Sequence, residues 1–164
     1  TKNKNYKSGA YISKDSPYNL YFKFLEDRWP DNNSFEGWWG FDTLPKLNYE
    51  GSKELCDYII EVGKKWVSPP YNVDGWRLDV CDEVGHEFWR AFRKVVKKAN
   101  KNAVIIGEIM HEANSFLKGD QLDGIMNYPF KNAIIDFFGK NIITAREFLD
   151  IMAENRVLYM DMLK

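Results

Sequence analysis

Apolar side chains recur at helical spacing in several stretches after residue 50. A candidate N-cap, Ser52, precedes the first stretch and Pro69-Pro70 ends it, which predicts a capped helix between them. A second helix is predicted with one apolar and one basic face: Phe88, Trp89, Phe92, Val95, Val96 and Ala99 against Arg90, Arg93, Lys94, Lys97 and Lys98. Because the apolar stripe is complete, the basic stripe is interpreted as a solvated face. Helices at roughly 130–138 and 144–162 complete the chain, the last beginning with a capping box of Thr144 and Glu147.

Three short apolar segments between these helices have the composition of strands. Residues 73–80 follow turn-forming residues, residues 103–109 form a continuous apolar run, and residues 122–126 follow a polar loop. A continuous apolar run is typical of a strand in a buried parallel sheet. The order of strands and helices predicts an α/β fold with a parallel sheet and crossover helices.

The first third of the chain has a different texture. Nearly half of the Phe, Trp and Tyr residues fall before position 50, and Asn, Asp, Ser, Gly and Pro interrupt them so often that no period survives. This pattern predicts an irregular, loop-rich segment held by aromatic packing. Composition favours a small aromatic core under a long loop, because aromatic rings usually bury themselves. The alternative, a platform on which sugar rings stack, stays open.

Length, charge and composition narrow the class of protein. The chain has 164 residues, with 23 Lys and Arg against 24 Asp and Glu, so no basic surface for nucleic acid is indicated. Hydrophobic residues at 45% and charged residues at 29% are typical of a globular protein. No apolar run approaches the length of a membrane span, and no basic-then-apolar leader opens the chain. The two cysteines and two histidines lack metal-ligand spacing, so no metal site is predicted.

Two carboxylates stand at the ends of neighbouring predicted strands. Arg77 and Asp79 are two positions apart on one strand, so they share a face and the guanidinium is expected to keep the carboxylate ionised. Glu108 closes the next strand, and parallel barrel strands present catalytic residues at this C-terminal rim. Most glycosidases use a pair of facing carboxylates as their catalytic residues. From spacing alone, the interpretation of Asp79 and Glu108 as solvated strand-end residues with a salt bridge from Arg77 is favoured over the catalytic one.

Several motifs resemble those of the α-amylase superfamily. Its nucleophile-strand pattern, Asp-Gly-x-Arg-x-Asp, is matched by Asp74-Gly75-Trp76-Arg77-Leu78-Asp79. Its general acid/base strand is similar to Gly107-Glu108-Ile109, and a marker of the cyclomaltodextrinase, neopullulanase and maltogenic amylase branch is similar to Leu44-Pro45-Lys46-Leu47-Asn48. Residues 38–41, 119–121 and 126–128 fit that branch too. The matches are ordered and correctly spaced, so together they are a strong resemblance.

The resemblance implies a fold, an activity and a set of site residues. The fold is part of a (β/α)8 TIM barrel, with about three central strands in residues 51–164 and an irregular aromatic-rich loop insertion between barrel strands in residues 1–50. The activity is retaining hydrolysis of α-1,4-glucosidic bonds in starch, maltooligosaccharides or cyclodextrins by the parent enzyme. Asp79 is implied as the nucleophile, Glu108 as the acid/base, and Arg77 as the residue that holds Asp79. The implied substrate-binding residues are Glu83, Met110, His111, Asn127 and Tyr128.

The sequence departs from the branch at several positions. Cys81 and Asp82 stand where the branch has Ala and Asn, and Met110 stands where it has Trp. At Met110 a flexible thioether replaces a rigid stacking ring, which leaves the acceptor-side preference open. Cys81 is interpreted as a small buried residue, not a reactive thiol. The family's third carboxylate, an Asp preceded by His, has no match after Tyr128, so these 164 residues alone are expected to be inactive. No cofactor is implied for them, and calcium, which some amylases bind, is left open for the full-length enzyme.

Two further functions stay open beside hydrolysis. One is a glucan-transferring enzyme in which sugar acceptors outcompete water, and the other is a non-catalytic relative kept for carbohydrate binding. Retention of Arg77, Asp79 and Glu108 together argues against the second. The expected partner is an α-glucan or cyclodextrin substrate, with no nucleic acid and no membrane. Unpaired sheet edges leave a homodimer open beside a monomer. A cytoplasmic location is expected.

Overall fold

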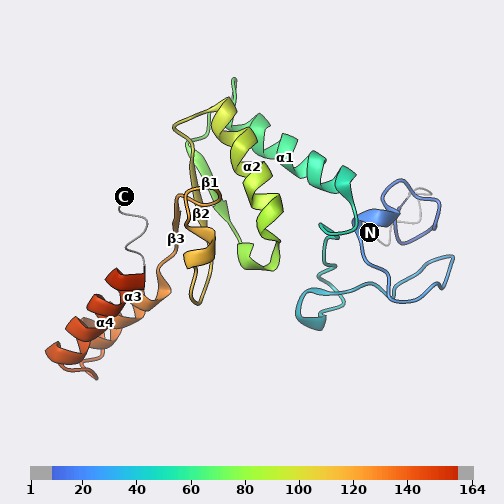
Figure 1. Cartoon of the computed structure of the whole chain (residues 1–164). Coiled ribbons are helices and arrows are strands. Elements are labelled where there is room, and N and C mark those ends of the chain that lie inside the picture. Colours follow the sequence, from blue (N-terminus) through green and yellow to red (C-terminus); the bar gives the residue numbers. More distant parts are fainter. Residues whose placement is uncertain (1–8, 159–164) are drawn as a thin grey trace. The chain divides into compact units, whose positions relative to one another are not determined.

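The computed structural model describes residues 9–158. The chain divides into two compact units, residues 1–59 and 60–164, and the boundary falls inside helix α1 (Lys53–Val67). The N-terminal unit is mostly loop, and the C-terminal unit holds the sheet (Figure 1).

The N-terminal unit is irregular, as the sequence predicts. Before α1 its described elements are two 3-10 helices, η1 (Asn19–Tyr21) and η2 (Trp38–Gly40). Isolated antiparallel bridges join distant parts of the loop: Phe22 with Leu47, Phe24 with Phe35, and Gly37 with Pro45. These single bridges hold the segment together without forming a continuous sheet in residues 9–59.

The aromatic rings of this unit pack on one another without becoming buried. Phe24 meets Trp29 edge-on with ring centroids 4.9 Å apart, and Trp38 stacks on Trp39 at 5.4 Å. Trp39 still leaves 78% of its surface exposed, and no aromatic side chain in residues 9–59 is buried. The expectation of a buried aromatic core is therefore wrong for the described residues, because their loops form no continuous layer over the rings.

Helix α1 begins and ends where the sequence predicts. The Oγ of Ser52 accepts a hydrogen bond from the N–H of Leu55 at 3.2 Å, which satisfies one of the free amides of the first turn. The helix ends at Val67, just before Pro69-Pro70. Leu55 and Val67 are both buried, so the apolar stripe of α1 contributes to the core.

Three parallel strands form the sheet of the C-terminal unit. They are β1 (Gly75–Leu78), β2 (Val104–Gly107) and β3 (Gly124–Ile125), in the order β1-β2-β3. Arg77 is in register with Ile106, and Ile106 with Gly124. The predicted parallel sheet is confirmed, with each strand shorter than the apolar segment that predicted it.

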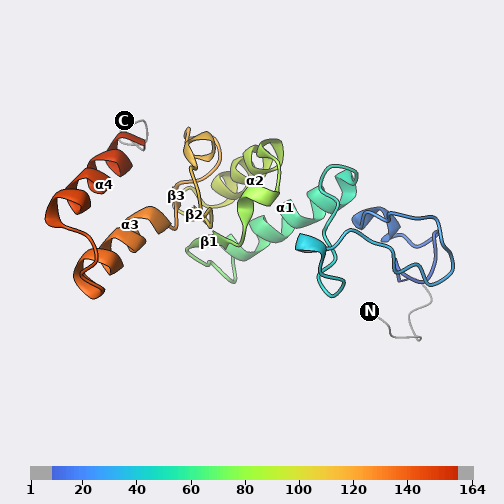
Figure 2. The same ribbon diagram turned by 90° about the horizontal axis from the view of Figure 1, so that it is seen from below.

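Helices α1 and α2 (His86–Ala99) lie next to each other beside the sheet in Figure 1 and Figure 2. Trp76 of β1 meets Phe92 of α2 edge-on with ring centroids 6.3 Å apart, and its Nε1–H donates to the carbonyl of Gly63 on α1 at 3.1 Å. Ile105 on β2 and Val96 on α2 are almost fully buried. One face of the sheet is thus covered by a core that both helices share.

The other face of the sheet is open in the described chain. Val104 and Ile106 alternate with the buried Ala103 and Ile105 along β2, and both are exposed. The continuous apolar run predicted a strand buried on both faces, and here only one face is buried, because residues 9–158 supply no second layer. This exposed face is the one that carries Arg77.

The last elements form a helical pair. Helix α3 (Tyr128–Ile134) runs into a π-helical turn, η5 (Ile135–Gly139), and α4 (Ala145–Leu158) lies beside α3 in both ribbon views (Figure 2). The capping box is confirmed: the N–H of Glu147 donates to Thr144 Oγ1 at 3.2 Å, and the N–H of Thr144 donates to Glu147 Oε2 at 2.7 Å. Residues 159–162 of the predicted last helix lie outside the described residues.

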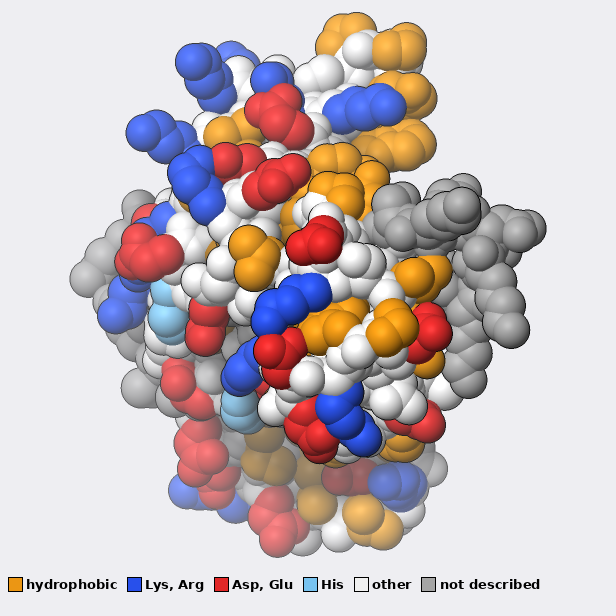
Figure 3. Space-filling view, turned by 90° about the vertical axis from the view of Figure 1, so that its right-hand side faces the viewer, with side chains coloured by type: hydrophobic (Ala, Val, Ile, Leu, Met, Phe, Trp, Pro, Cys, Tyr) orange, Lys and Arg blue, Asp and Glu red, His pale blue; other side chains and the backbone are white. Residues whose placement is uncertain are grey.

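Charged groups of both signs are interspersed with hydrophobic side chains on the face that Figure 3 presents. This mixture agrees with the near balance of acidic and basic residues. None of the helices in residues 9–158 combines the length and the apolar composition that crossing a bilayer requires.

The close approach of α1 and α2 gives a test of the packing. A Cβ added at Gly63 would lie 2.3 Å from the ring of Phe92, whereas one added at Gly124 would meet no atom within 4 Å. Gly63→Ala is therefore expected to lower the free energy of unfolding of the chain by about 1–3 kcal/mol through overpacking, although alanine is the better helix former. Urea unfolding followed by tryptophan fluorescence measures the change. Gly124→Ala is the control and should leave the free energy of unfolding unchanged. Equal stability of the two variants would contradict the packing described.

Candidate active site

Arg77 and Asp79 lie together on the open face, at the C-terminal end of β1. The strand ends at Leu78, and Asp79 follows it directly. Arg77 Nη1 donates to Asp79 Oδ1, as the shared face of positions two apart predicts. The Asp79 side chain remains 76% exposed, so its carboxylate is open to a substrate.

Glu108 stands at the end of β2 and has a very different environment. The residue is only 8% exposed. Its Oε1 lies 2.9 Å from Arg77 Nη2 and accepts a hydrogen bond from the Tyr128 hydroxyl at 2.7 Å. Its Oε2 accepts the backbone N–H of Val80 at 3.2 Å. Arg77 therefore bridges an exposed and a buried carboxylate on neighbouring strands.

The backbone after Asp79 turns sharply to reach Glu108. Val80 adopts a left-handed conformation, with φ 42° and ψ 48°, which is uncommon for a β-branched residue. The next N–H, of Cys81, donates to the Glu108 carbonyl at 3.2 Å. Two consecutive amides, of Val80 and Cys81, thus hold both the side chain and the main chain of Glu108. They belong to residues 79–82, the segment that directly follows β1 and is called the β1 tail below.

Charge and burial set the ionisation of this cluster. The hydrogen bond from Arg77 lowers the pKa of the Asp79 carboxyl below its usual value, against an opposing effect of desolvation. The same contact raises the pKa of the Arg77 guanidinium. The hydrogen bond to Glu108 raises the pKa of the Tyr128 hydroxyl, which keeps it protonated as a donor. The site therefore offers a charged nucleophile beside a buried carboxyl group.

Cys81 packs directly behind the catalytic strands. The residue is fully buried, and burial raises the pKa of its thiol to about 12. A neutral, enclosed thiol is a poor nucleophile. The interpretation of Cys81 as a small buried residue is confirmed.

The other predicted site residues lie on the loops around this cluster. Glu83 is exposed in the 3-10 helix η3 (Cys81–Glu83), and Met110 and His111 are exposed in the loop after β2. His111 Nε2 lies 3.5 Å from Asp82 Oδ2, which links the β2 loop to the β1 tail. Asn127 caps α3, its Oδ1 accepting the N–H of Phe130 at 3.1 Å. Tyr128 contacts the carboxylate pair directly, through its hydrogen bond to Glu108.

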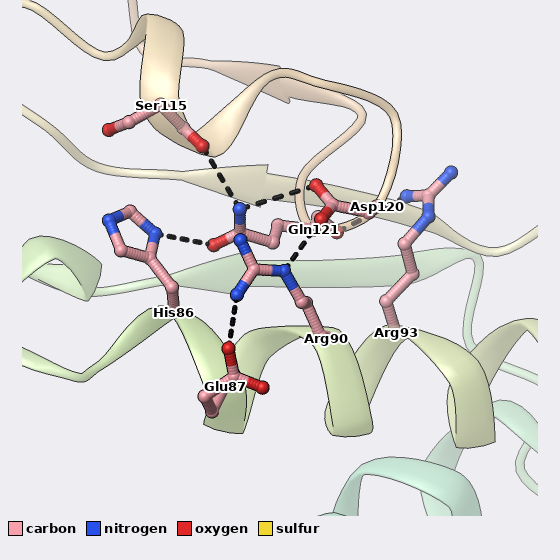
Figure 4. Close-up of polar contacts among 7 residues, drawn as sticks. All are labelled: His86, Glu87, Arg90, Arg93, Ser115, Asp120 and Gln121. Carbon is pink, nitrogen blue, oxygen red and sulfur yellow. Dashed lines mark hydrogen bonds and ion pairs between the residues drawn. The ribbon is translucent and has the colours of Figure 1, made fainter.

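A buried polar network ties the loop after β2 to helix α2 (Figure 4). Gln121 is fully buried; its Oε1 lies 2.7 Å from His86 Nδ1, and its Nε2 donates to the Ser115 carbonyl at 3.0 Å. Arg90 Nε donates to Asp120 at 2.6 Å. The loop that begins with Met110 is thus anchored at its far end.

The basic stripe of α2 also takes part in this anchoring. Arg93 Nη1 and Lys97 Nζ donate to the two oxygens of Asp123 at 2.7 and 2.6 Å. Asp123 Oδ2 in turn accepts the N–H of Ile105 on β2 at 2.9 Å. The interpretation of this stripe as a solvated face is therefore wrong for Arg93 and Lys97, because Asp123, directly before β3, brings a carboxylate to them.

The described residues contain no group of three or more His, Cys, Asp and Glu placed to hold a metal ion. His86 and His111 instead have the polar neighbours given above. Sequence reasoning missed Val80 and Gln121 as residues that shape the site. Gln121 lies in the stretch 119–121 that fits the branch, but that match assigned it no role.

Comparisons with known proteins place the chain in a family. The model of the α-amylase catalytic domain matches residues 2–162, so the chain belongs to the α-amylase family. Within that family it is similar to the branch that the sequence motifs indicate. A cyclomaltodextrinase of Thermoanaerobacter pseudethanolicus is 41% identical over 81% of this chain and 25% of the relative. Neopullulanase 2 of Thermoactinomyces vulgaris is 44% identical over 71% of this chain and 20% of the relative.

Solved structures agree with this assignment. A debranching enzyme of Nostoc punctiforme, soaked with acarbose, superposes with a TM-score of 0.81 at 30% identity, covering 93% of this chain and 36% of that one. A cyclomaltodextrinase structure gives a TM-score of 0.76 at 39% identity, covering 85% of this chain and 24% of that one. The chain spans about a quarter or less of these curated relatives, and its three strands are part of a TIM-barrel catalytic domain. The predicted family and fold class are confirmed.

The contact between Arg77 and Asp79 predicts a change in ionisation. In Arg77→Gln the pKa of the Asp79 carboxyl should rise towards its ordinary value, because the cation that favours the charged form is gone. Carbon-13 NMR titration of the Asp79 carboxyl carbon measures this pKa. Arg90→Gln, which removes the ion pairs of Arg90 with Glu87 and Asp120, is the matched control and should leave the pKa of Asp79 where it is. An unchanged Asp79 titration in Arg77→Gln would contradict the electrostatic role given to Arg77.

Proposed function

We propose that the chain supplies the nucleophile and the acid/base of an enzyme that hydrolyses α-1,4-glucosidic bonds with retention of configuration. The observation that carries this proposal is the bridge from Arg77 to both Asp79 and Glu108 across neighbouring parallel strands. It puts an ionised, exposed carboxylate beside a buried carboxyl group at the C-terminal rim of the strands, where barrel enzymes hold their catalytic residues.

The two environments suit the two halves of a retaining mechanism. Asp79, held ionised by Arg77, attacks the anomeric carbon and forms a covalent glycosyl-enzyme. Glu108 donates a proton to the departing glycosidic oxygen, then takes a proton from the water that releases the sugar. Charge that develops on the sugar during both steps lies beside the Asp79 carboxylate, which stabilises it.

The loops around the carboxylates are proposed to bind the glucan. Glu83, Met110 and His111 lie on the two loops that follow β1 and β2, and Asn127 and Tyr128 begin α3 after β3. Residues 1–50 are proposed to be a loop insertion of the barrel, in which exposed rings such as Trp39 stack on sugar. Cyclodextrins and maltooligosaccharides are the proposed substrates, in line with the names of the relatives.

Transfer of the glycosyl group to a second sugar is the alternative reaction, since a covalent intermediate accepts either water or an alcohol. The exposed Met110, where the branch carries Trp, is the observation that favours it, because a flexible thioether replaces a rigid ring near the acceptor. A cytoplasmic location is proposed on the resemblance to an intracellular maltogenic amylase of Bacillus subtilis, 39% identical over 62% of this chain.

The proposal is tested on the full-length protein that carries this chain, with β-cyclodextrin, pullulan, maltotriose and starch. Hydrolysis is expected, with cyclodextrin opened faster than starch, and proton NMR should show the α-anomer formed first. Asp79→Asn is expected to lower kcat by roughly 10⁴-fold or more, because a carboxamide cannot act as the nucleophile.

Asp136→Asn is the matched control, since Asp136 pairs with Lys140 in the helical region after α3. It should retain wild-type turnover. Hydrolysis that survives in Asp79→Asn would refute the nucleophile assignment, and an intact full-length protein without turnover on any of the four glucans would refute the proposed function.

A further inference from the structure

The two oxygens of the Glu108 carboxylate are held unequally. Oε1 accepts the Tyr128 hydroxyl at 2.7 Å and lies 2.9 Å from the guanidinium nitrogen Nη2 of Arg77. Oε2 has a single donor among the described residues, the backbone N–H of Val80 at 3.2 Å. A carboxylate oxygen offers two lone pairs. Oε1 therefore has both a hydroxyl donor and a cation against it, while Oε2 has one backbone donor and retains a lone pair for a proton.

Tyr128 is fixed in place from several sides. It is the first residue of α3, whose N-cap Asn127 accepts the N–H of Phe130 at 3.1 Å. The ammonium of Lys131, one turn later, lies 5.0 Å from the centre of the Tyr128 ring, a favourable cation–π distance. The ring is thus held by its own helix while its hydroxyl reaches across to the end of β2.

Val80 fixes the other oxygen through its backbone. A left-handed conformation costs a β-branched residue free energy that the surroundings have to offset. Here the conformation aims the Val80 N–H at Oε2 and the Cys81 N–H at the Glu108 carbonyl. The Glu108 carboxyl group is consequently held between the tail of β1 and the start of α3. These contacts fix its orientation and give its two oxygens different partners.

We propose that Tyr128 is a positioning residue for the acid/base: its hydroxyl, together with the Arg77 guanidinium, occupies Oε1 of Glu108, so that Oε2 is the oxygen that delivers and recovers the proton. This inference rests on the proposed function and specifies Oε2 of Glu108 as the atom that transfers the proton. Tyr128 itself touches no reacting atom in this role.

The proton then follows one route through both half-reactions. Oε2 gives its proton to the glycosidic oxygen while the bond from that oxygen to the anomeric carbon breaks and an Asp79 oxygen bonds to the carbon. The leaving sugar departs as an alcohol. In the second half, water gives a proton to Oε2 and its oxygen replaces Asp79 on the carbon. Oε1 keeps the hydrogen bond from Tyr128 and the ion pair with Arg77 throughout, so neither partner has to move.

A pair of substrates separates positioning of the acid from other roles of Tyr128. Maltotriose needs a proton on its leaving oxygen, whereas α-maltosyl fluoride loses fluoride without that protonation and depends only on Asp79. In the full-length protein, Tyr128→Phe is expected to lower kcat/KM for maltotriose by roughly 10- to 100-fold, because a displaced acid transfers its proton less effectively. The kcat/KM for α-maltosyl fluoride should stay within about twofold of wild type, since general acid catalysis is not needed there.

Two outcomes would overturn the inference. Equal loss on both substrates would show that the hydroxyl serves folding or sugar binding, and wild-type values on both would show that it is not needed. Tyr71→Phe, which removes a hydroxyl from a ring packed on Trp66 before β1, is the matched control and should leave both substrates unaffected. If circular dichroism shows that Tyr128→Phe does not fold, Lys131→Met, which removes the cation over the Tyr128 ring, takes its place. A smaller loss of kcat/KM that is confined to maltotriose supports the positioning role of Tyr128, and any other result refutes it.

Failure of the inference is distinguishable from failure of the proposed function. Glu108→Gln should itself lose maltotriose hydrolysis selectively while retaining turnover of α-maltosyl fluoride into the glycosyl-enzyme. If Glu108→Gln shows this selectivity and Tyr128→Phe does not, the acid/base assignment stands and the positioning role of Tyr128 falls. If Glu108→Gln lacks the selectivity, the proposed function itself is wrong.

Discussion

The register between β1 and β2 is the constraint on which the site depends. Arg77 is paired with Ile106, so the residues two positions later, Asp79 and Glu108, emerge at the same edge of the sheet. Only in that register does one guanidinium reach both carboxylates. A slip of one residue would turn the side chains of one strand to the covered face and separate the pair. Trp76, packed edge-on against the buried Phe92, and the buried Ile105 fill the opposite face and hold the register.

This register places the two carboxyl groups in different environments, as the proposed mechanism requires. Asp79 remains open to solvent and is kept ionised by its neighbour, while Glu108 is enclosed by the tail of β1 and the start of α3. The buried polar network around Gln121 and the ion pairs to Asp123 fix the loops and strands beside them. Rigid elements thus place the two carboxyl groups, and the surrounding loops are left to set substrate preference.

Much of this arrangement was predictable from the sequence because it is periodic or local. The spacing of Arg77 and Asp79 on a strand and the single strand–helix repeat to Glu108 place the three together, and Ser52 and Thr144 mark helix starts by capping chemistry. The left-handed Val80 was not predictable, since a β-branched residue carries no signal for that conformation. The exposure of Trp39 and the pairing of Arg93 with Asp123 were also missed, because both depend on tertiary neighbours and not on local pattern.

The central claim is that Asp79 forms a covalent bond to the sugar. A 5-fluoro-α-maltosyl fluoride, which forms the glycosyl-enzyme readily and releases it slowly, should label the full-length protein that carries this chain. Protease digestion and mass spectrometry then locate the sugar. The account predicts one added maltosyl group on the peptide that contains Asp79, bonded to its carboxylate. A label on another residue, or turnover of the fluoride with no covalent adduct, would contradict it.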